Sequence, residues 1–314
     1  MKPLKKYNIN NYMILTNKII SLLPNNLIID EKYDYHDELN IDLAISIMKS
    51  FLNDYDPKLL NMFKNIYELD SNSFKLISKD TIEEDFNSRI DLDTGIITIP
   101  LNNNITDIFH IVHEFIHKVD YSHTNNYNQN FSNFGEVIPI TFELYLFNYL
   151  ISNGILINDS INYLKNRFKN NIEICYLMKF IEFINENYNE NITDFARNYI
   201  EIEEFKLKIN KLPENVQKVF INNFDYFRLI INWYGEEINN YLFSNLRYNY
   251  AILLAPYLYK INDKKLLESI NKYAYSNQDN NIEINIDLAC QEFKLFINEL
   301  FNKENKKVYN KKVI

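Results

Sequence analysis

Glycine is scarce in this chain, with four residues among 314, and the seven prolines add few further breaks. β-Sandwiches and loop-rich scaffolds need many tight turns, which glycine and proline usually supply. Long stretches of this chain instead carry Ile, Leu, Phe and Tyr at helical spacing. Because 46% of the residues are hydrophobic, the chain can also bury a sizeable core. The sequence therefore predicts a mainly α-helical protein.

One small β region interrupts this pattern, at about residues 74–100. Phe74–Ser78 and Gly95–Pro100 are short and β-branched, and Asp93-Thr94-Gly95 supplies turn residues before the second strand. The helical pattern predicts helices elsewhere, at about residues 9–23, 37–53, 57–69, 106–121 and 134–150, and a series of helices from about 159 to 301.

Charge and cysteine content exclude several classes of function. A formal net charge of −9 argues against a nucleic-acid partner, because phosphate binding needs a basic face. Cys175 and Cys290 are isolated, so we expect reduced thiols in a cytoplasmic protein. We expect no membrane partner either: the longest apolar run, Val137–Ile151, is too short to span a bilayer, and no secretory signal is evident. Nothing in the sequence specifies an oligomeric state.

The segment His113-Glu114-Phe115-Ile116-His117 has the spacing of a catalytic zinc site. Two histidines four residues apart lie on the same face of a helix, so both rings can reach one ion. Glu114 beside the first histidine can act as general base without being a ligand. Chance gives roughly 0.006 such matches in a chain of this composition. The motif predicts one Zn²⁺ per chain and metal-assisted hydrolysis of a peptide bond.

A catalytic zinc site needs a third protein ligand, for which two acidic residues compete. Glu136 and Glu143 are two helical turns apart, so both carboxylates lie on one face of an otherwise apolar helix. Burying them is costly unless a metal or hydrogen bonds compensate. One of them is therefore expected to bind the ion, and the other to orient a ligand or the substrate.

His123 is an alternative third ligand. The spacing of His113, His117 and His123 is similar to the three-histidine pattern of the metzincins. Asp120 stands where that pattern has the glycine of its turn, and aspartate tolerates a left-handed backbone better than most residues.

Three stretches resemble the thimet oligopeptidase and oligoendopeptidase F family of zinc peptidases. They are the strand, loop and helix entry from Ile97 through Phe109 into the histidine motif, Gly135-Glu136-Val137 with Glu143 seven residues on, and Tyr248-Asn249-Tyr250-Ala251 followed by Ala255.

The resemblance implies a shortened member of that family with a zincin-like catalytic core, in which Glu136 is the third zinc ligand. It also implies that Tyr248 and Tyr250 hydrogen-bond the oxyanion of a peptide substrate. We expect a single catalytic domain over residues 1–314, with N-terminal helices (1–70), the β region and zinc-site helices (71–150) and a C-terminal helical part (151–314). The strand at Ile96–Pro100 is expected to hold the substrate by edge pairing.

The chain departs from the family at Ile116, where the family usually has glycine. This departure leaves a second hypothesis open, in which an inactive zincin-fold module binds a peptide or protein without cleaving it.

Overall fold

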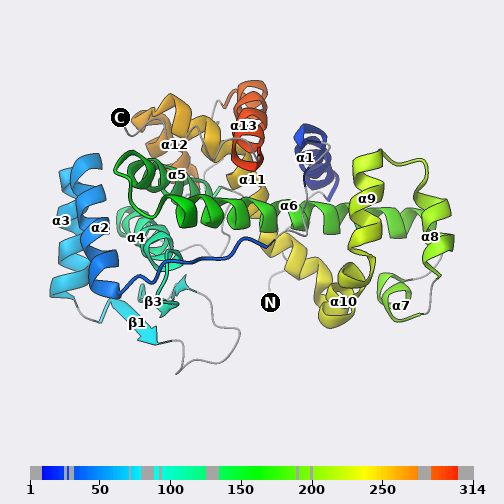
Figure 1. Ribbon diagram of the computed structural model, residues 1–314, viewed down its shortest axis with the longest axis horizontal. Coiled ribbons are helices and arrows are strands. Elements are labelled where there is room, and N and C mark those ends of the chain that lie inside the picture. The colour runs from blue at the N-terminus through cyan, green and yellow to red at the C-terminus, as the bar shows by residue number, and fades with distance from the viewer. Residues whose placement is uncertain are drawn as a thin grey trace. The chain divides into compact units, whose positions relative to one another are not determined.

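Helices dominate the architecture of the chain, as Figure 1 shows for a computed structural model of it. The structure describes residues 9–24, 27, 32–70, 72–78, 88–91, 94–124, 134–188, 191–198, 201–274 and 284–302. The prediction of a mainly α-helical protein is confirmed. In this part of the chain, no helix combines the length and apolarity that crossing a membrane requires.

The described residues form the following helices and strands, in chain order. They are α1 (Ile9–Leu22), α2 (Ile41–Tyr55), α3 (Pro57–Lys64), the π-helix η1 (Asn65–Leu69), β1 (Phe74–Ser78), β2 (Arg89–Ile90), β3 (Ile97–Leu101), α4 (Thr106–Thr124), α5 (Val137–Ser152), α6 (Ile157–Asn187), α7 (Ile192–Arg197), α8 (Ile202–Ile209), α9 (Glu214–Asn222), α10 (Phe224–Tyr234), the 3₁₀ turn η3 (Gly235–Glu237), α11 (Ile238–Ile261), α12 (Lys264–Ala274) and α13 (Ile286–Phe301).

The described chain divides into two compact units. The first contains Met1–Glu31 and Arg167–Tyr250, and the second contains Lys32–Asn166 and Ala251–Ile314. Two of the three boundaries between the units fall inside helices, one in α6 and one in α11. These limits differ from the sections expected from the sequence, and a single catalytic domain over 1–314 stays a prediction.

The first unit is built around phenylalanine. Phe180 of α6 is fully buried, and its ring lies 5.2–6.2 Å, centroid to centroid, from rings carried by α7, α8, α9 and α10. Edge-to-face and tilted ring pairs of this kind add to the free energy of burying the rings. The surrounding rings are those of Phe195, Phe205, Phe220, Phe224 and Phe227.

The second unit contains the small sheet, whose strands are ordered β1-β3-β2. β1 runs parallel to β3, from Phe74 opposite Ile97 to Ser78 opposite Leu101, whereas β2 runs antiparallel and pairs with Ile97 and Thr98. β3 is therefore the central strand, and β2 was not anticipated from the sequence. At Ile97 and Thr98, β3 is paired with β1 on one side and with β2 on the other. The expectation that Ile96–Pro100 holds a substrate by edge pairing is therefore wrong at these two residues.

α4 is the helix around which the second unit is packed. It lies between β3 and α5 in Figure 1, and it also contacts α2. Phe115, on the face of α4 opposite His113 and His117, is fully buried. Its ring meets the ring of Phe63 from α3 edge-on, with 5.3 Å between the centroids. The helix begins at Thr106, as the sequence predicts, and ends at Thr124, three residues later than expected.

Asp107 fixes the turn by which the chain passes from β3 into α4. Its buried carboxylate accepts the backbone N–H groups of Asn102 and Asn103, at 2.9 and 2.8 Å. Asn104 accepts the N–H of Thr106 at 2.9 Å, which satisfies one of the free amides at the start of the helix. The strand and the histidine-bearing helix are thus joined by a tightly bonded turn.

Gly154 ends α5 and redirects the chain into α6. It has φ of +70°, and the backbone bonds Gly154 N–H to Ile151 and Ile155 N–H to Leu150 complete a Schellman motif. A Cβ atom built at this position would meet nothing within 4 Å, so backbone conformation and not space requires glycine here.

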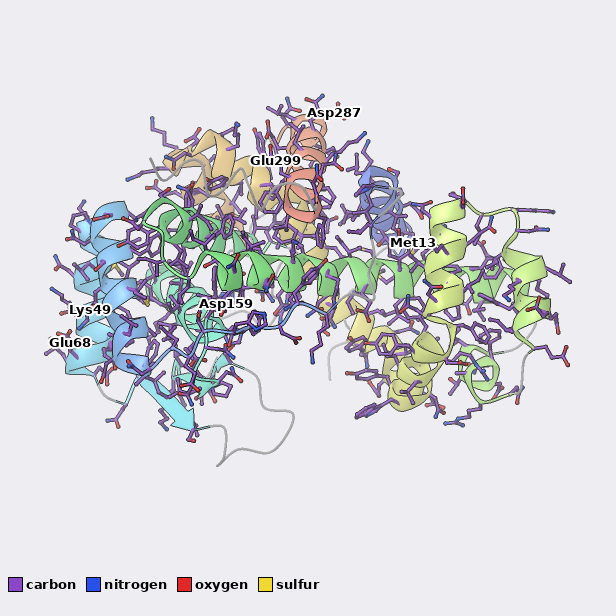
Figure 2. All side chains as sticks on the ribbon, in the orientation of Figure 1. Met13, Lys49, Glu68, Asp159, Asp287 and Glu299 are labelled. Atoms are coloured by element: carbon purple, nitrogen blue, oxygen red, sulfur yellow. The ribbon has the colours of Figure 1, made fainter. Side chains whose placement is uncertain are left out.

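An extended segment, residues 33–37, is bonded to the first turns of α6. Asp159, labelled in Figure 2 and fully buried, accepts the backbone N–H groups of His36 and Asp37 at 2.8–3.1 Å. The side-chain amide of Asn166 bonds both the N–H and the carbonyl of Tyr33. Side chains of α6 thus take the place of a neighbouring strand.

Replacing Gly154 with alanine should destabilise the protein by about 1 kcal/mol, because a left-handed conformation costs an L-residue about 1–2 kcal/mol. Gly154→Asn should cost less, since asparagine tolerates this conformation. Urea unfolding of the two variants beside the wild type measures the difference. A stabilisation by Gly154→Ala, as alanine gives at ordinary backbone positions, would contradict this role of the glycine.

Candidate metal centre

Two histidines and one glutamate meet between α4 and α5. His113 and His117 are one turn apart on α4, so their rings emerge from the same face of the helix. Glu136 is the residue immediately before α5, and the packing of α5 on α4 places its carboxylate against both rings. All three side chains are buried, with 2–7% of each residue exposed.

The three donor atoms form an almost regular triangle. Nε2 of His113 lies 3.2 Å from Nε2 of His117 and 3.1 Å from Oε2 of Glu136, and His117 Nε2 lies 3.4 Å from the same oxygen. Zinc bonds of about 2.0–2.1 Å in tetrahedral geometry require donors about 3.3 Å apart. The donor set and its spacing therefore fit one Zn²⁺ and leave the fourth position for water or substrate.

Glu143 supports His113 from the side of the ring away from the triangle. Its Oε1 lies 2.7 Å from Nδ1 of His113, and the carboxylate is fully buried. A carboxylate that accepts from one ring nitrogen fixes the tautomer and turns the other nitrogen toward a metal. Glu136 and Glu143 thus have different positions: Glu136 lies in the donor triangle, and Glu143 lies against the other ring nitrogen of His113. The assignment of Glu136 as zinc ligand and of Glu143 as its supporting acid stays a prediction.

The electrostatics of the site favour a cation. Burial lowers the pKa of His113, but hydrogen bonds to Glu136 and Glu143 and the charges of both carboxylates outweigh burial and raise this pKa to about 9. In the metal-free chain a proton on the ring therefore offsets part of the negative charge. A divalent cation bound by the same three donors would offset more of it.

Glu114 and Ile116 flank the histidine pair. Successive residues of an α-helix are rotated by about 100° about the helix axis. Glu114 and Ile116 are therefore each about 80° around the axis from the midpoint between His113 and His117, on opposite sides of it. Both are buried, at 5% and 2% exposure. Glu114 is not among the three donors, and its role as general base stays a prediction.

His123 lies on the last turn of α4, and its side chain is outside the described residues. The helix continues unbroken from His117 through Asp120 to Thr124, so the backbone at His123 is about 9 Å further along the axis than His117. A three-histidine site would need the chain to turn at Asp120. The continuous helix thus argues against this alternative.

Tyr248 and Tyr250 lie on α11 in the first unit, whereas the donor triangle lies in the second unit. The ring of Tyr248 is stacked by two guanidinium groups, those of Arg167 and Arg247, each 5.1 Å from its centroid. A role of either tyrosine at the oxyanion stays a prediction.

Sequence reasoning missed Tyr163, whose hydroxyl reaches Glu143 Oε2 at 3.2 Å. Tyr163 is one of 24 tyrosines and lies in no motif, so the sequence held no signal for it. Only the packing of α6 against α4 and α5 reveals the contact.

No protein-family model, curated protein sequence or solved structure matches this chain. The assignment of a function therefore depends on the residues and geometry of the site itself.

Wild-type protein should bind one Zn²⁺ per chain, whereas His117→Ala and Glu136→Ala should bind none after dialysis, because each loses a corner of the donor triangle. Glu214→Ala, at an exposed position on α9, is the matched control and should keep its zinc. Elemental analysis gives the stoichiometry.

Thermal melting gives an independent readout of the same variants. A free zinc concentration of 100 times Kd should stabilise the wild type by about 2.7 kcal/mol and leave Glu136→Ala unaffected. Full zinc binding by Glu136→Ala would remove Glu136 from the ligand set.

Proposed function

We propose that this chain is a zinc-dependent peptidase with a zincin-like core, in which His113, His117 and Glu136 hold the ion. The observation that carries the proposal is the donor triangle with sides of 3.1–3.4 Å. Glu114, which is buried and follows His113 on the same helix, is the candidate general base. Three protein ligands with an adjacent carboxylate that is not a ligand are typical of hydrolytic zinc sites.

The reaction follows from the residues around the triangle. His113, His117 and Glu136 would hold the Zn²⁺, which would supply Lewis acidity for activating water and polarising a carbonyl group. Glu114 accepts a proton from the attacking water as the oxygen–carbon bond forms. It then gives this proton to the amine nitrogen as the carbon–nitrogen bond breaks. Glu143 keeps His113 oriented throughout, so the ligand set is ready before the substrate arrives.

The substrate class comes from the resemblance to the thimet oligopeptidase and oligoendopeptidase F family, whose members act on short peptides. The same resemblance assigns Tyr248 and Tyr250 to the oxyanion of the tetrahedral intermediate, where a hydroxyl donor would stabilise developing charge. We therefore propose a short-peptide substrate in the cytoplasm, and neither a nucleic-acid nor a membrane partner.

Glu114→Gln should lower kcat/KM on a quenched short-peptide mixture by about 10²–10⁴-fold, because the amide cannot accept the proton. Its zinc content should equal that of the wild type, since Glu114 is not a ligand. Glu214→Gln makes the same chemical change at an exposed position and should leave activity unchanged.

The zinc measurement separates the competing hypotheses. Zinc bound at one per chain with no cleavage of peptides by the wild type would indicate an inactive zincin-fold binding module. Activity that survives in Glu114→Gln would exclude Glu114 as the general base.

A further inference from the structure

We infer that Tyr163 is a positioning residue of the metal centre, which acts on the ion through Glu143 and His113. The inference rests on the metal-binding part of the proposed function and is independent of catalysis. Three buried side chains from three helices, Tyr163 of α6, Glu143 of α5 and His113 of α4, form a continuous chain of hydrogen bonds.

The hydroxyl of Tyr163 holds one oxygen of the Glu143 carboxylate. It donates to Oε2 at 3.2 Å, while Oε1 lies 2.7 Å from Nδ1 of His113. With one oxygen held by Tyr163 and the other by His113, the carboxylate is restrained from rotating about its last bond. An oriented carboxylate in turn restrains the plane of the imidazole.

Stacking fixes the tyrosine itself. Its ring lies nearly parallel to that of Phe109, at 10° and 3.9 Å between centroids, and the ring of His110 meets it edge-on. Phe109 is one turn before His113 on α4, so the same helix carries the ligand and the surface on which Tyr163 rests. The aromatic contact therefore sets where the hydroxyl points, and removing the oxygen alone leaves this contact in place.

The hydroxyl of Tyr163 matters because it is buried together with Glu143. Within the folded second unit, Tyr163 is 5% exposed and Glu143 is 0% exposed, so water cannot readily substitute for a lost partner. Without the hydroxyl, one oxygen of a buried carboxylate loses a donor, and the pair formed by Glu143 and His113 becomes less well oriented. His113 Nε2 would then bind the metal ion more weakly.

The test is the Zn²⁺ affinity of Tyr163→Phe, measured by competition with a chromophoric chelator. Partners that support metal ligands typically contribute 10–100-fold to affinity, so Glu143→Gln should raise Kd by that factor and Tyr163→Phe by about three- to tenfold. Tyr176→Phe is the matched control, because it removes the hydroxyl of another buried tyrosine on α6, and it should leave Kd unchanged.

A double-mutant cycle distinguishes positioning from a general loss of stability. In the Glu143→Leu background the added Tyr163→Phe change should have little further effect on Kd, because leucine can pair with neither the tyrosine hydroxyl nor the His113 ring. The visible spectrum of the Co²⁺-substituted protein should also change in Tyr163→Phe and not in Tyr176→Phe. Melting of the metal-free variants checks that each is folded.

Three results would overturn the inference: wild-type affinity in Tyr163→Phe, an equal loss in both backgrounds, or no zinc binding by the wild type. If the wild type binds zinc with this pattern of affinities but cleaves no peptide, the proposed peptidase activity fails and the role of Tyr163 stands.

Discussion

The burial of two carboxylates is the constraint on which the second unit depends. Glu136 and Glu143 are 2% and 0% exposed, at the start and on one face of a helix that is otherwise apolar. Each buried charge costs several kcal/mol unless nearby groups compensate it. α4 supplies the compensation through His113 and His117, so α5 must pack on α4 in the register that brings these groups together. The residues of the candidate metal centre are thus also part of the core of this unit.

Much of this arrangement could be predicted from local sequence. Helical periodicity alone places His113 and His117 on one face, because a spacing of four residues is one turn regardless of what surrounds it. The turn residues before β3 and the start of α4 at Thr106 are likewise local features. The spacing of Glu136 and Glu143 predicts that both lie on one face of a helix. Only the resemblance to a known family favours Glu136 over Glu143 as the metal ligand.

The rest depends on contacts between distant parts of the chain. Tyr163 reaches Glu143 from α6, where its ring stacks on Phe109 of α4, and no pattern within α6 encodes this partner. β2 is two residues long, too short for alternation to mark it, yet it makes β3 a central strand. Two of the three boundaries between the compact units fall within helices, where no turn or linker residues mark them.

The extended segment at residues 33–37 has a consequence for how opening of the molecule can be observed. The amide protons of Tyr33, His36 and Asp37 are held by side chains of α6, namely those of Asn166 and Asp159. They can exchange with deuterated solvent only when the segment separates from that helix. Their common exchange rate would therefore report the free energy of this local opening. The chain thus carries three natural isotope reporters beside the helix that bears Tyr163.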